Sequence, residues 1–473
     1  MAERVMRSTR RTTDRALLGR TAELAADFLE SLDDRPVAAP AGRDALLDAL
    51  GGPLPRAGTP ATEVIEHLAR HAEPGVVGIA GPRYFGFVIG GGYPVAVAAD
   101  WLTSAWDQNA GIYATSPAAA VVEHVAATWV RTLLGLPPTA GVGFVTGGQM
   151  ANFTCLAAAR HDVLRKAGWD VEEHGLYGAP PITVVVGDEA HVTIFSALRY
   201  LGLGAGRVRT VEVDGQGRMR PDALAATLAT CDGPTIVCAQ AGNVNTGSFD
   251  SLAEIAPLTR GRAAWLHVDG AFGLWAAASP ALRHLVAGVE LADSWATDAH
   301  KWLNVPYDSG LAIVADASAH RAAMSITAAY LVPGASDERD PLDWAPEFSR
   351  RARGFPVYAA LRALGARGVA ELVGRCCALA RRMAQRLAAA PRVTVLNDVV
   401  LNQVLVRFAA PDGGDADAFT RAVVEQVQRD GTCWLSGTTW QGKAAMRISV
   451  INWSTTEADA DRSAAAILKA AKA

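Results

Sequence analysis

From about residue 75 to residue 345, short apolar runs alternate with longer stretches in which apolar residues recur at helical spacing. The clearest runs, at 182–186, 235–239, 264–268 and 310–314, have the length of strands. This alternation predicts a mostly parallel sheet with helices on both faces. In such a sheet, ligands bind beyond the carboxyl ends of the strands.

The two flanking segments have different patterns. Residues 1–74 contain two amphipathic helical stretches joined by a linker rich in proline, glycine and alanine, which predicts a helical arm. Residues 346–473 mix helical stretches with alternating strands, which predicts a small α+β domain between this point and the C-terminus. The helices and strands expected there lie at 358–364, 369–389, 393–396, 401–408 and 445–451. We therefore expect an arm (1–74), a large α/β domain (75–345) and a small C-terminal domain (346–473).

Composition narrows the class of protein. Half of the 473 residues are hydrophobic and 19% are charged, so a large core can form. The net charge of −4 provides no strong field for nucleic acid or an acidic membrane. No apolar run is long enough to span a bilayer, and no signal peptide is evident. The six cysteines have neither CxxC nor zinc spacing. We expect a cytoplasmic protein with reduced thiols and no metal site.

Two strand-end segments carry candidate chemistry. One apolar run ends in Asp269, and a later one ends in His300-Lys301-Trp302. A lone lysine is usually a solvated surface residue and a lone aspartate usually a cap, but burial between apolar neighbours disfavours a lysine charge. The pair suits an enzyme that uses pyridoxal phosphate: Lys301 forms the Schiff base, and Asp269 keeps the pyridine nitrogen protonated.

Two further strand ends support this interpretation. After the run at 143–145, Gly147 and Gly148 lead into a helical stretch, and the free N–H groups at its start favour a phosphate. The alternative is an ordinary glycine turn. After the run at 184–186 comes His191, whose neutral imidazole can stack on an aromatic ring. The alternative there is a capping or loop histidine.

With these four motifs in the order Gly-Gly, His, Asp, Lys, the chain resembles the pyridoxal-phosphate-dependent group II decarboxylases, the family that includes aromatic-L-amino-acid decarboxylase. The resemblance extends from about residue 75 to about 370. Besides the four motifs, it is carried by Ser116-Pro117-Ala118, Glu123, Trp129, Leu134-Gly135-Leu136-Pro137, Gly247-Ser248-Phe249-Asp250, Ala292-Asp293-Ser294, Arg350, Arg351 and Arg353.

The resemblance implies fold type I, the aspartate aminotransferase-like fold. It also implies a homodimer in which the N-terminal arm of each subunit wraps around the partner subunit. An independent cap on the arm's own subunit is the alternative. It implies decarboxylation of an L-amino acid, aromatic in the first instance, to an amine and CO2 through a Lys301 aldimine. Lys301, His191 and Asp269 would be catalytic. The residues expected to bind pyridoxal 5'-phosphate are Gly147, Gly148, Gln149, His191, Asn243, Asp269, Ala271, His300 and Lys301.

The chain departs from the family pattern in several places. Asn243 and Asp298 stand where relatives often have Thr and Asn. The expected loop at 325–349 belongs to the region where the family has a mobile loop with a proton-donating Tyr. Here 331–357 contains no Tyr, and Tyr330 lies at its start. A decarboxylation-dependent aldehyde synthase or another lyase of the same cofactor class is therefore the alternative function.

Aromatic residues predict a pocket for an aromatic side chain. The expected substrate residues are Phe87, Trp106, Tyr113 and Tyr330, although Phe87 and its neighbours could equally pack the core. Two hypotheses from other classes are a nicotinamide-dependent oxidoreductase, suggested by the glycines at 90–92, and a non-catalytic relative. No G-x-G-x-x-G follows a strand here, and the presence of both Lys301 and Asp269 disfavours a non-catalytic protein.

Overall fold

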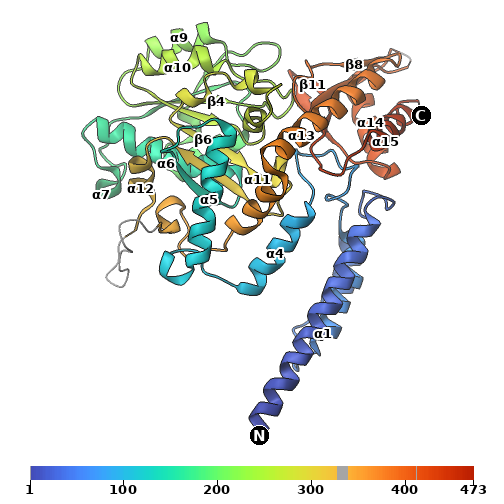
Figure 1. Cartoon of the computed structure of the whole chain (residues 1–473). Coiled ribbons are helices and arrows are strands. Elements are labelled where there is room, and N and C mark those ends of the chain that lie inside the picture. Colours follow the sequence, from blue (N-terminus) through green and yellow to red (C-terminus); the bar gives the residue numbers. More distant parts are fainter. Residues whose placement is uncertain (1, 327–338, 412, 473) are drawn as a thin grey trace.

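The computed structural model describes residues 2–326, 339–411 and 413–472, and the side chains from residue 14 onward. A seven-stranded sheet forms the centre of the large domain (Figure 1). Its strands are β1 (Gly141–Val145), β2 (Thr183–Gly187), β3 (Arg209–Val211), β4 (Thr235–Gln240), β5 (Trp265–Asp269), β6 (Ser294–Asp298) and β7 (Gly310–Val314). The order is β1-β7-β6-β5-β4-β2-β3, and β7 alone of these seven runs antiparallel to its neighbours. The predicted mostly parallel sheet is confirmed.

Helices cover both faces of this sheet, which is why strands such as β5 and β7 are buried along their whole length. One face packs on Leu156 of α6 and Ile194 of α8, and the other on Trp275 and Trp302. The helices are α4 (Pro94–Trp106), α5 (Pro117–Leu134), α6 (Gly148–Lys166), α7 (Val171–His174), α8 (Val192–Tyr200), α9 (Pro221–Ala229), α10 (Leu252–Arg260), α11 (Ala299–Trp302) and α12 (Ala317–Met324). Short 3-10 turns are η1 (Glu73–Gly75), η2 (Tyr113–Thr115), η3 (Ala205–Arg207), η4 (Gly273–Ala278), η5 (Arg283–Val286), η6 (Val289–Leu291) and η7 (Pro341–Trp344).

The C-terminal part contains a second, fully antiparallel sheet of order β10-β11-β9-β8. Its elements are α13 (Gly354–Ala388), β8 (Val393–Val395), β9 (Gln403–Phe408), α14 (Ala416–Asp430), β10 (Ser436–Trp440), β11 (Lys443–Ser449) and α15 (Glu457–Ala470). The two helices predicted at 358–364 and 369–389 are segments of α13, separated by non-helical Gly365 with φ 61°. The domain boundaries after residues 74 and 345 stay predictions.

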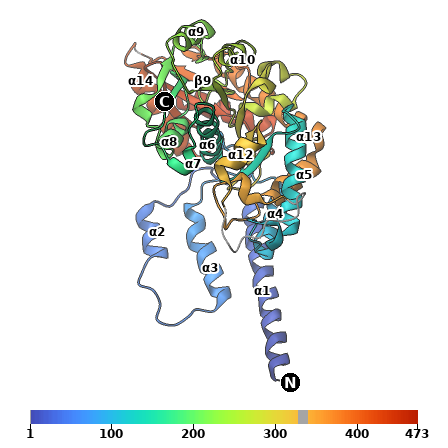
Figure 2. The ribbon, with the colours of Figure 1, turned by 90° about the vertical axis from the view of Figure 1, so that its left-hand side faces the viewer.

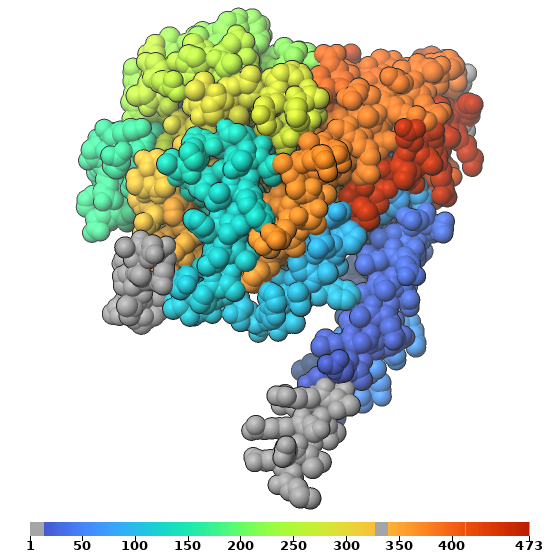
Figure 3. Space-filling model, viewed as in Figure 1, coloured from blue at the N-terminus to red at the C-terminus, as the bar shows by residue number. Residues whose placement is uncertain are grey.

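The N-terminal arm consists of α1 (Ala2–Ser31), α2 (Arg43–Leu50) and α3 (Ala61–Ala72). It extends away from the rest of the chain (Figures 1 and 2), and the space-filling view shows it projecting below the body (Figure 3). At its base, Arg83 donates hydrogen bonds to the carbonyl oxygens of Asp33 and Arg35, at 2.9 and 3.1 Å. The arm is thus tied to the body at its base.

The predicted loop at 325–349 is described in part. Tyr330, one of the expected substrate residues, lies outside the described residues, as does the rest of 327–338. Where the description resumes, Arg339 packs over the ring of Trp344, and Asp340 accepts a hydrogen bond from the backbone N–H of Tyr113. No helix among the described residues has both the length and the apolarity needed to cross a membrane.

Candidate active site

The sheet brings the predicted site residues to one edge. Asp269 ends β5, and Lys301 lies in the short helix that follows the neighbouring strand β6. His191 follows β2, and Gly147 follows β1. Because these strands run parallel to one another, their carboxyl ends open on the same side of the sheet. Residues from four separate parts of the sequence therefore meet there.

Asp269 is buried and held by two donors. The side-chain amide of Asn152 donates to Oδ2 at 3.1 Å, and the backbone N–H of Ala271 donates to Oδ1 at 3.2 Å. Asn152 in turn contacts His267, with its oxygen 2.9 Å from Nε2 of the ring. Burial lowers the pKa of His267 to about 4, so the ring is neutral and Nε2 carries the proton that Asn152 accepts. This fixes the Asn152 amide with its nitrogen toward Asp269.

His191 is linked to the same network. Its Nδ1 lies 2.8 Å from the hydroxyl of Thr193, which accepts a hydrogen bond from the Asn152 amide at 3.1 Å. Burial is the main cause that lowers the pKa of His191; Asp269 opposes it, while Lys301 and Arg447 add to it. The imidazole is therefore neutral near pH 7, as stacking on a cofactor ring would require.

Lys301 forms a close ion pair in this structure. Its Nζ lies 2.9 Å from Oδ2 of Asp298, which is 2% exposed. The other oxygen of Asp298 is 3.6 Å from Nε2 of His300, and the pKa of His300 is lowered chiefly by burial. Asp298, which stands where the resemblance leads one to expect Asn, therefore points at the lysine.

The Gly147-Gly148 turn lies directly against these residues. A Cβ at Gly148 would be 2.9 Å from Oδ2 of Asp298, and one at Gly147 would be 3.3 Å from Cε1 of His300. Side chains would close this space, so the glycines are needed for close approach. At the start of α6, the N–H groups of Gly148, Gln149 and Met150 have no hydrogen-bond partner among the described residues. They form a ready anion seat.

The glycines at 90–92 have a packing role. A Cβ at Gly90 would be 2.2 Å from the carbonyl oxygen of Lys301, and the N–H of Gly90 donates to the carbonyl of His300 at 3.2 Å. The N–H of Gly91 donates to the side chain of Asn304 at 2.6 Å. This run therefore supports the backbone of the lysine segment, which accounts for it without a nucleotide.

The predicted aromatic residues do not all gather at this site. Phe87 lies beside Trp434, which stacks on Tyr84 with ring centroids 5.1 Å apart. Tyr84 lies six residues before Gly90, whose N–H donates to the carbonyl of His300 beside Lys301. By contrast, Trp106 packs edge-on against Phe355 at the end of α4. Neither Trp106 nor Tyr113 forms a hydrogen bond or ring pair with Lys301 or its neighbours among the described residues.

Asn243 has a local structural role. Its side-chain oxygen accepts hydrogen bonds from the N–H groups of Asn245 and Thr246, at 2.8 and 3.1 Å, and its amide donates to the carbonyl of Glu189 at 3.4 Å. These bonds fix the turn after β4. Its predicted contact with the cofactor stays a prediction, as does that of Gln149, whose side chain is exposed.

Two residues at the site were not selected from the sequence. Arg447 on β11 is 8% exposed, donates to the side chain of Asn245 at 3.4 Å, and influences His191. Its signal was a charge inside the apolar run 444–450. Asn152 stands four residues after Gly148, on the buried face of α6. Its signal was a polar residue at a helical core position.

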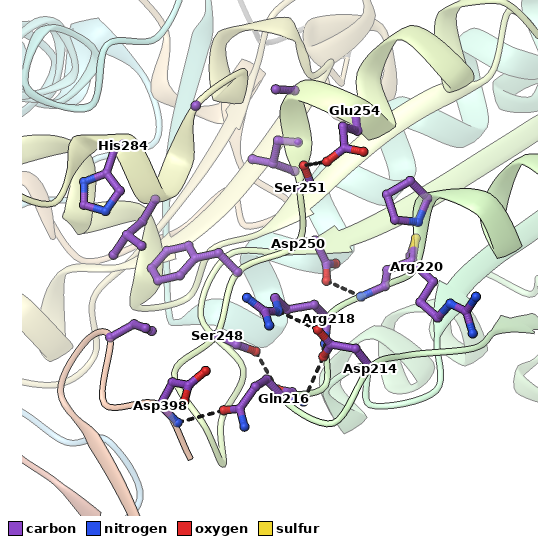
Figure 4. A pocket seen from close by; sticks show the side chains of 18 residues that line it. Asp214, Gln216, Arg218, Arg220, Ser248, Asp250, Ser251, Glu254, His284 and Asp398 are labelled. Carbon is purple, nitrogen blue, oxygen red and sulfur yellow. Dashed lines mark hydrogen bonds and ion pairs between the residues drawn. The ribbon is translucent and has the colours of Figure 1, made fainter.

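A cavity of about 440 Å³ lies behind the site, between the loops 214–221 and 248–254 (Figure 4). Asp250 lines both this cavity and the small pit beside His191 and Asp269. Its carboxylate accepts backbone N–H groups from Met219 and Gln240, each at 2.7 Å, and burial raises its pKa to about 6. Asp250 thus acts as a wall between the two spaces.

The residues present fit pyridoxal phosphate. Lys301 supplies the amine and Asp269 an oriented carboxylate, while the unpaired N–H groups of α6 offer a place for the phosphate. Nδ1 of His300 and Oδ1 of Asp298 are buried without a hydrogen-bond partner among the described residues. These orphaned atoms, at the edge of the anion seat, indicate that a polar group belongs beside them.

Comparisons with known proteins agree with this assignment. Residues 47–409 match the family model described as the pyridoxal-dependent decarboxylase conserved domain. An aromatic-L-amino-acid decarboxylase of Bacillus atrophaeus is 27% identical over 444 residues, covering 92% of this chain and 90% of that protein. A 4-hydroxyphenylacetaldehyde synthase of Rhodiola rosea is 26% identical over 440 residues, covering 89% of this chain and 88% of that protein. The crystal structure of Oryza sativa TDC with PLP and tryptamine has a TM-score of 0.90 and 25% identity, covering 97% of each chain.

Proposed function

Because this chain belongs to the pyridoxal-dependent decarboxylase family and is an amino acid decarboxylase that uses pyridoxal phosphate, we propose that it converts an aromatic L-amino acid to the amine and CO2, with Lys301 as the residue that attaches the cofactor. The observation that carries this proposal is that Lys301 and the buried, doubly hydrogen-bonded Asp269 lie at the carboxyl ends of adjacent strands.

Each residue has a distinct part in the proposed reaction. When bound, pyridoxal phosphate supplies a ring that accepts the electron pair of a bond broken at the substrate Cα. The carboxylate of Asp269, fixed by Asn152, would keep the ring nitrogen protonated by charge pairing. Lys301 would release the cofactor to the substrate amine and then serve as an acid or base.

Two residues are suited to the substrate carboxylate. Arg447 is a buried cation with no ion-pair partner among the described residues, and it acts on His191. A guanidinium recognises a carboxylate through paired N–H donors. We assign Arg447 to hold the carboxylate, and neutral His191 to stack on the ring and accept or donate one further hydrogen bond. Together they would select the rotamer in which the carboxylate leaves.

The aromatic substrate class rests on an exposed aromatic cluster and on similar proteins. Tyr84, Phe87 and Trp434 form a stack of rings, of which Phe87 is 56% exposed. An exposed ring offers a flat apolar surface to a substrate ring. The similar protein from Bacillus atrophaeus is named for aromatic substrates, and that from Oryza sativa holds tryptamine.

The alternative product is an aldehyde. It is favoured by the lack of Tyr at 331–357 and by similarity to the aldehyde synthase of Rhodiola rosea. Without a phenol to donate a proton at the substrate Cα, that carbon would stay open to reaction with oxygen. We keep simple decarboxylation as the first assignment, because Lys301 is itself able to return the proton.

One experiment separates these outcomes. Purified holoenzyme is incubated with each common L-amino acid, and CO2, amine, aldehyde and peroxide are measured together. Amine and CO2 in equal amounts from an aromatic substrate support the proposal, while aldehyde with peroxide supports the alternative. Borohydride reduction followed by peptide mapping identifies the attachment residue, and a label on any lysine other than Lys301 contradicts the assignment.

We further propose that the enzyme acts as a homodimer in the cytosol. Apolar side chains on the arm and on α4 are exposed in the single chain, among them Leu18 at 65%, Leu68 at 53% and Trp101 at 45%. A second copy is the natural cover for such a surface in this family. All six cysteines are free thiols, as is usual in a reducing compartment.

A further inference from the structure

Asp298 places a carboxylate at the seat where a phosphate is expected. Its Oδ2 lies 2.9 Å from the position a Gly148 Cβ would take, at the open N-terminus of α6. It also lies 2.9 Å from Nζ of Lys301. Its other oxygen is buried without a hydrogen-bond partner among the described residues. Without cofactor, the ammonium of Lys301 balances this charge.

Cofactor binding removes that balance. Lys301 must lose a proton before its nitrogen can attack the aldehyde, and its ammonium then no longer faces Asp298. A carboxylate that stays ionised would have a phosphate dianion as its neighbour. Two like charges in a buried site cannot both stay fully ionised at low cost, so one of them takes up a proton.

We propose that Asp298 is the group that takes up this proton and keeps it against the phosphate. In the binding step, the ammonium of Lys301 passes one proton across 2.9 Å to the Asp298 carboxylate, leaving a neutral amine and a carboxylic acid. The amine then adds to the aldehyde, and water leaves. The Asp298 O–H donates a hydrogen bond to a phosphate oxygen, which converts a repulsion into a contact.

The other titratable groups around Asp298 support this assignment. His300 and Lys301 face it from α11, Tyr307 from the loop that follows, and His191 from the start of α8. Burial lowers the pKa of both histidines, so neither supplies a positive charge near pH 7. Asp308, an acid that acts on His300, is paired with Arg353 at 2.8 Å, and Asp269 is held by Asn152 and Ala271. Arg447 on β11 also acts on His191, but it is the cation assigned to the substrate carboxylate. Lys301 is therefore the cation that balances Asp298, and this balance is lost when its ammonium loses a proton.

The test measures binding and does not use turnover. Apoenzyme is titrated from pH 6.5 to 8.5 with pyridoxal phosphate and with pyridoxal, which lacks the phosphate, and dissociation constants are read from the absorption of the bound cofactor. Wild type is compared with Asp298→Asn, whose amide cannot ionise. If the wild type retains one more proton, the ratio of its Kd for pyridoxal phosphate to that of the variant rises about tenfold per pH unit. The same ratio for pyridoxal stays constant.

Controls keep the result interpretable. Asp293→Asn removes a half-buried acid just before the start of β6, where it accepts the N–H of Leu266, and should keep wild-type pH dependence. If Asp298→Asn does not fold, proton exchange is measured on wild type alone. Binding of pyridoxal phosphate should then take up one more proton than binding of pyridoxal does. Equal proton exchange, or a Kd ratio independent of pH, overturns the role of Asp298 while leaving Lys301 in place. The inference rests on the proposed attachment at Lys301, and absence of a cofactor band in wild type would overturn both.

Discussion

Asn152 and Asp269 are joined across 117 residues of sequence by a hydrogen bond of 3.1 Å from amide to carboxylate. The bond has one orientation, because neutral His267 donates to the Asn152 oxygen and leaves its nitrogen for Asp269. The carboxylate of Asp269 is buried, and this bond helps to hold it in one orientation. Asn152 also contacts Thr193, so the same amide couples the Asp269 and His191 positions.

Replacing Asn152 should impair turnover more than it impairs folding. Asn152→Ala removes one charge-assisted donor to Asp269, a contact worth about 1.5–3 kcal/mol, so kcat/KM should fall roughly ten- to a hundredfold. The measurement is steady-state kinetics, together with a spectroscopic pH titration of the bound cofactor. Thr154→Val is a matched buried change on α6 whose hydroxyl bonds only the Met150 carbonyl. Equal losses in both variants would mean that Asn152 is merely structural.

Asp269→Asn should bind cofactor and turn over slowly. An amide preserves the shape and can accept one of the two hydrogen bonds, but it carries no charge to keep the ring nitrogen protonated, so the electron sink weakens. The expected loss in kcat is at least roughly ten- to a hundredfold, with cofactor content measured by absorption. Turnover near the wild-type value at full cofactor content would refute the role of Asp269.

Replacing Arg447 should weaken the reaction of substrates that have a carboxylate and leave binding of the product amine nearly unchanged. Arg447→Ala removes the buried cation, so kcat/KM should fall roughly ten- to a hundredfold. The product lacks the carboxylate, so inhibition by the amine should stay within about twofold. Arg447→Lys keeps charge without the planar pair of donors, and its activity should lie between the two. Parallel losses for substrate and amine would show a general distortion of β11.

The sequence predicted those parts of the site whose signal is local. β5 and β7 are apolar runs because both faces of the sheet are covered, and the lysine and aspartate stand at recognisable strand ends. β10 was not predicted, because Ser436–Trp440 is largely polar and gains its structure from pairing with β11. Asn152 and Arg447 were not selected, because their contacts join residues far apart in the chain. Trp106 was selected by residue type, which cannot show which way a side chain faces.

Stability should fall as the pH drops below about 6.5. Burial lowers the pKa of His267 to about 4 and that of His320 to about 3, so the unfolded chain binds these protons first. The loss begins at the unfolded pKa and continues down to the folded values. Asp250, with its pKa raised to about 6, acts oppositely and is stabilising at the acid end of this range. Thermal unfolding between pH 7 and 4.5 measures the slope.

The contribution of His320 can be isolated. Its Nε2 donates to the Trp344 carbonyl at 3.1 Å, and His320→Gln offers an amide donor that does not titrate. The variant should lose less stability between pH 6.5 and 4.5 than wild type does, even if it is less stable at pH 7. His284→Gln, at an exposed position, is the control and should keep the wild-type slope. An unchanged slope in His320→Gln would contradict the assignment.

Assembly should depend on the apolar surface of the arm and α4. Leu68 and Trp101 are half exposed in one chain, and covering such side chains is worth roughly 1.5–3 kcal/mol each. Obligate interfaces commonly bury over about 2,000 Å², so wild type should show the mass of a dimer at every working concentration. A charge at either position would have to be buried on association, so Leu68→Glu and Trp101→Glu should shift the population toward monomer in light scattering. Tyr177→Glu, at a 98% exposed site on another part of the chain, should leave the dimer intact. A wild-type protein that is active as a monomer would contradict this assembly, whatever the variants do.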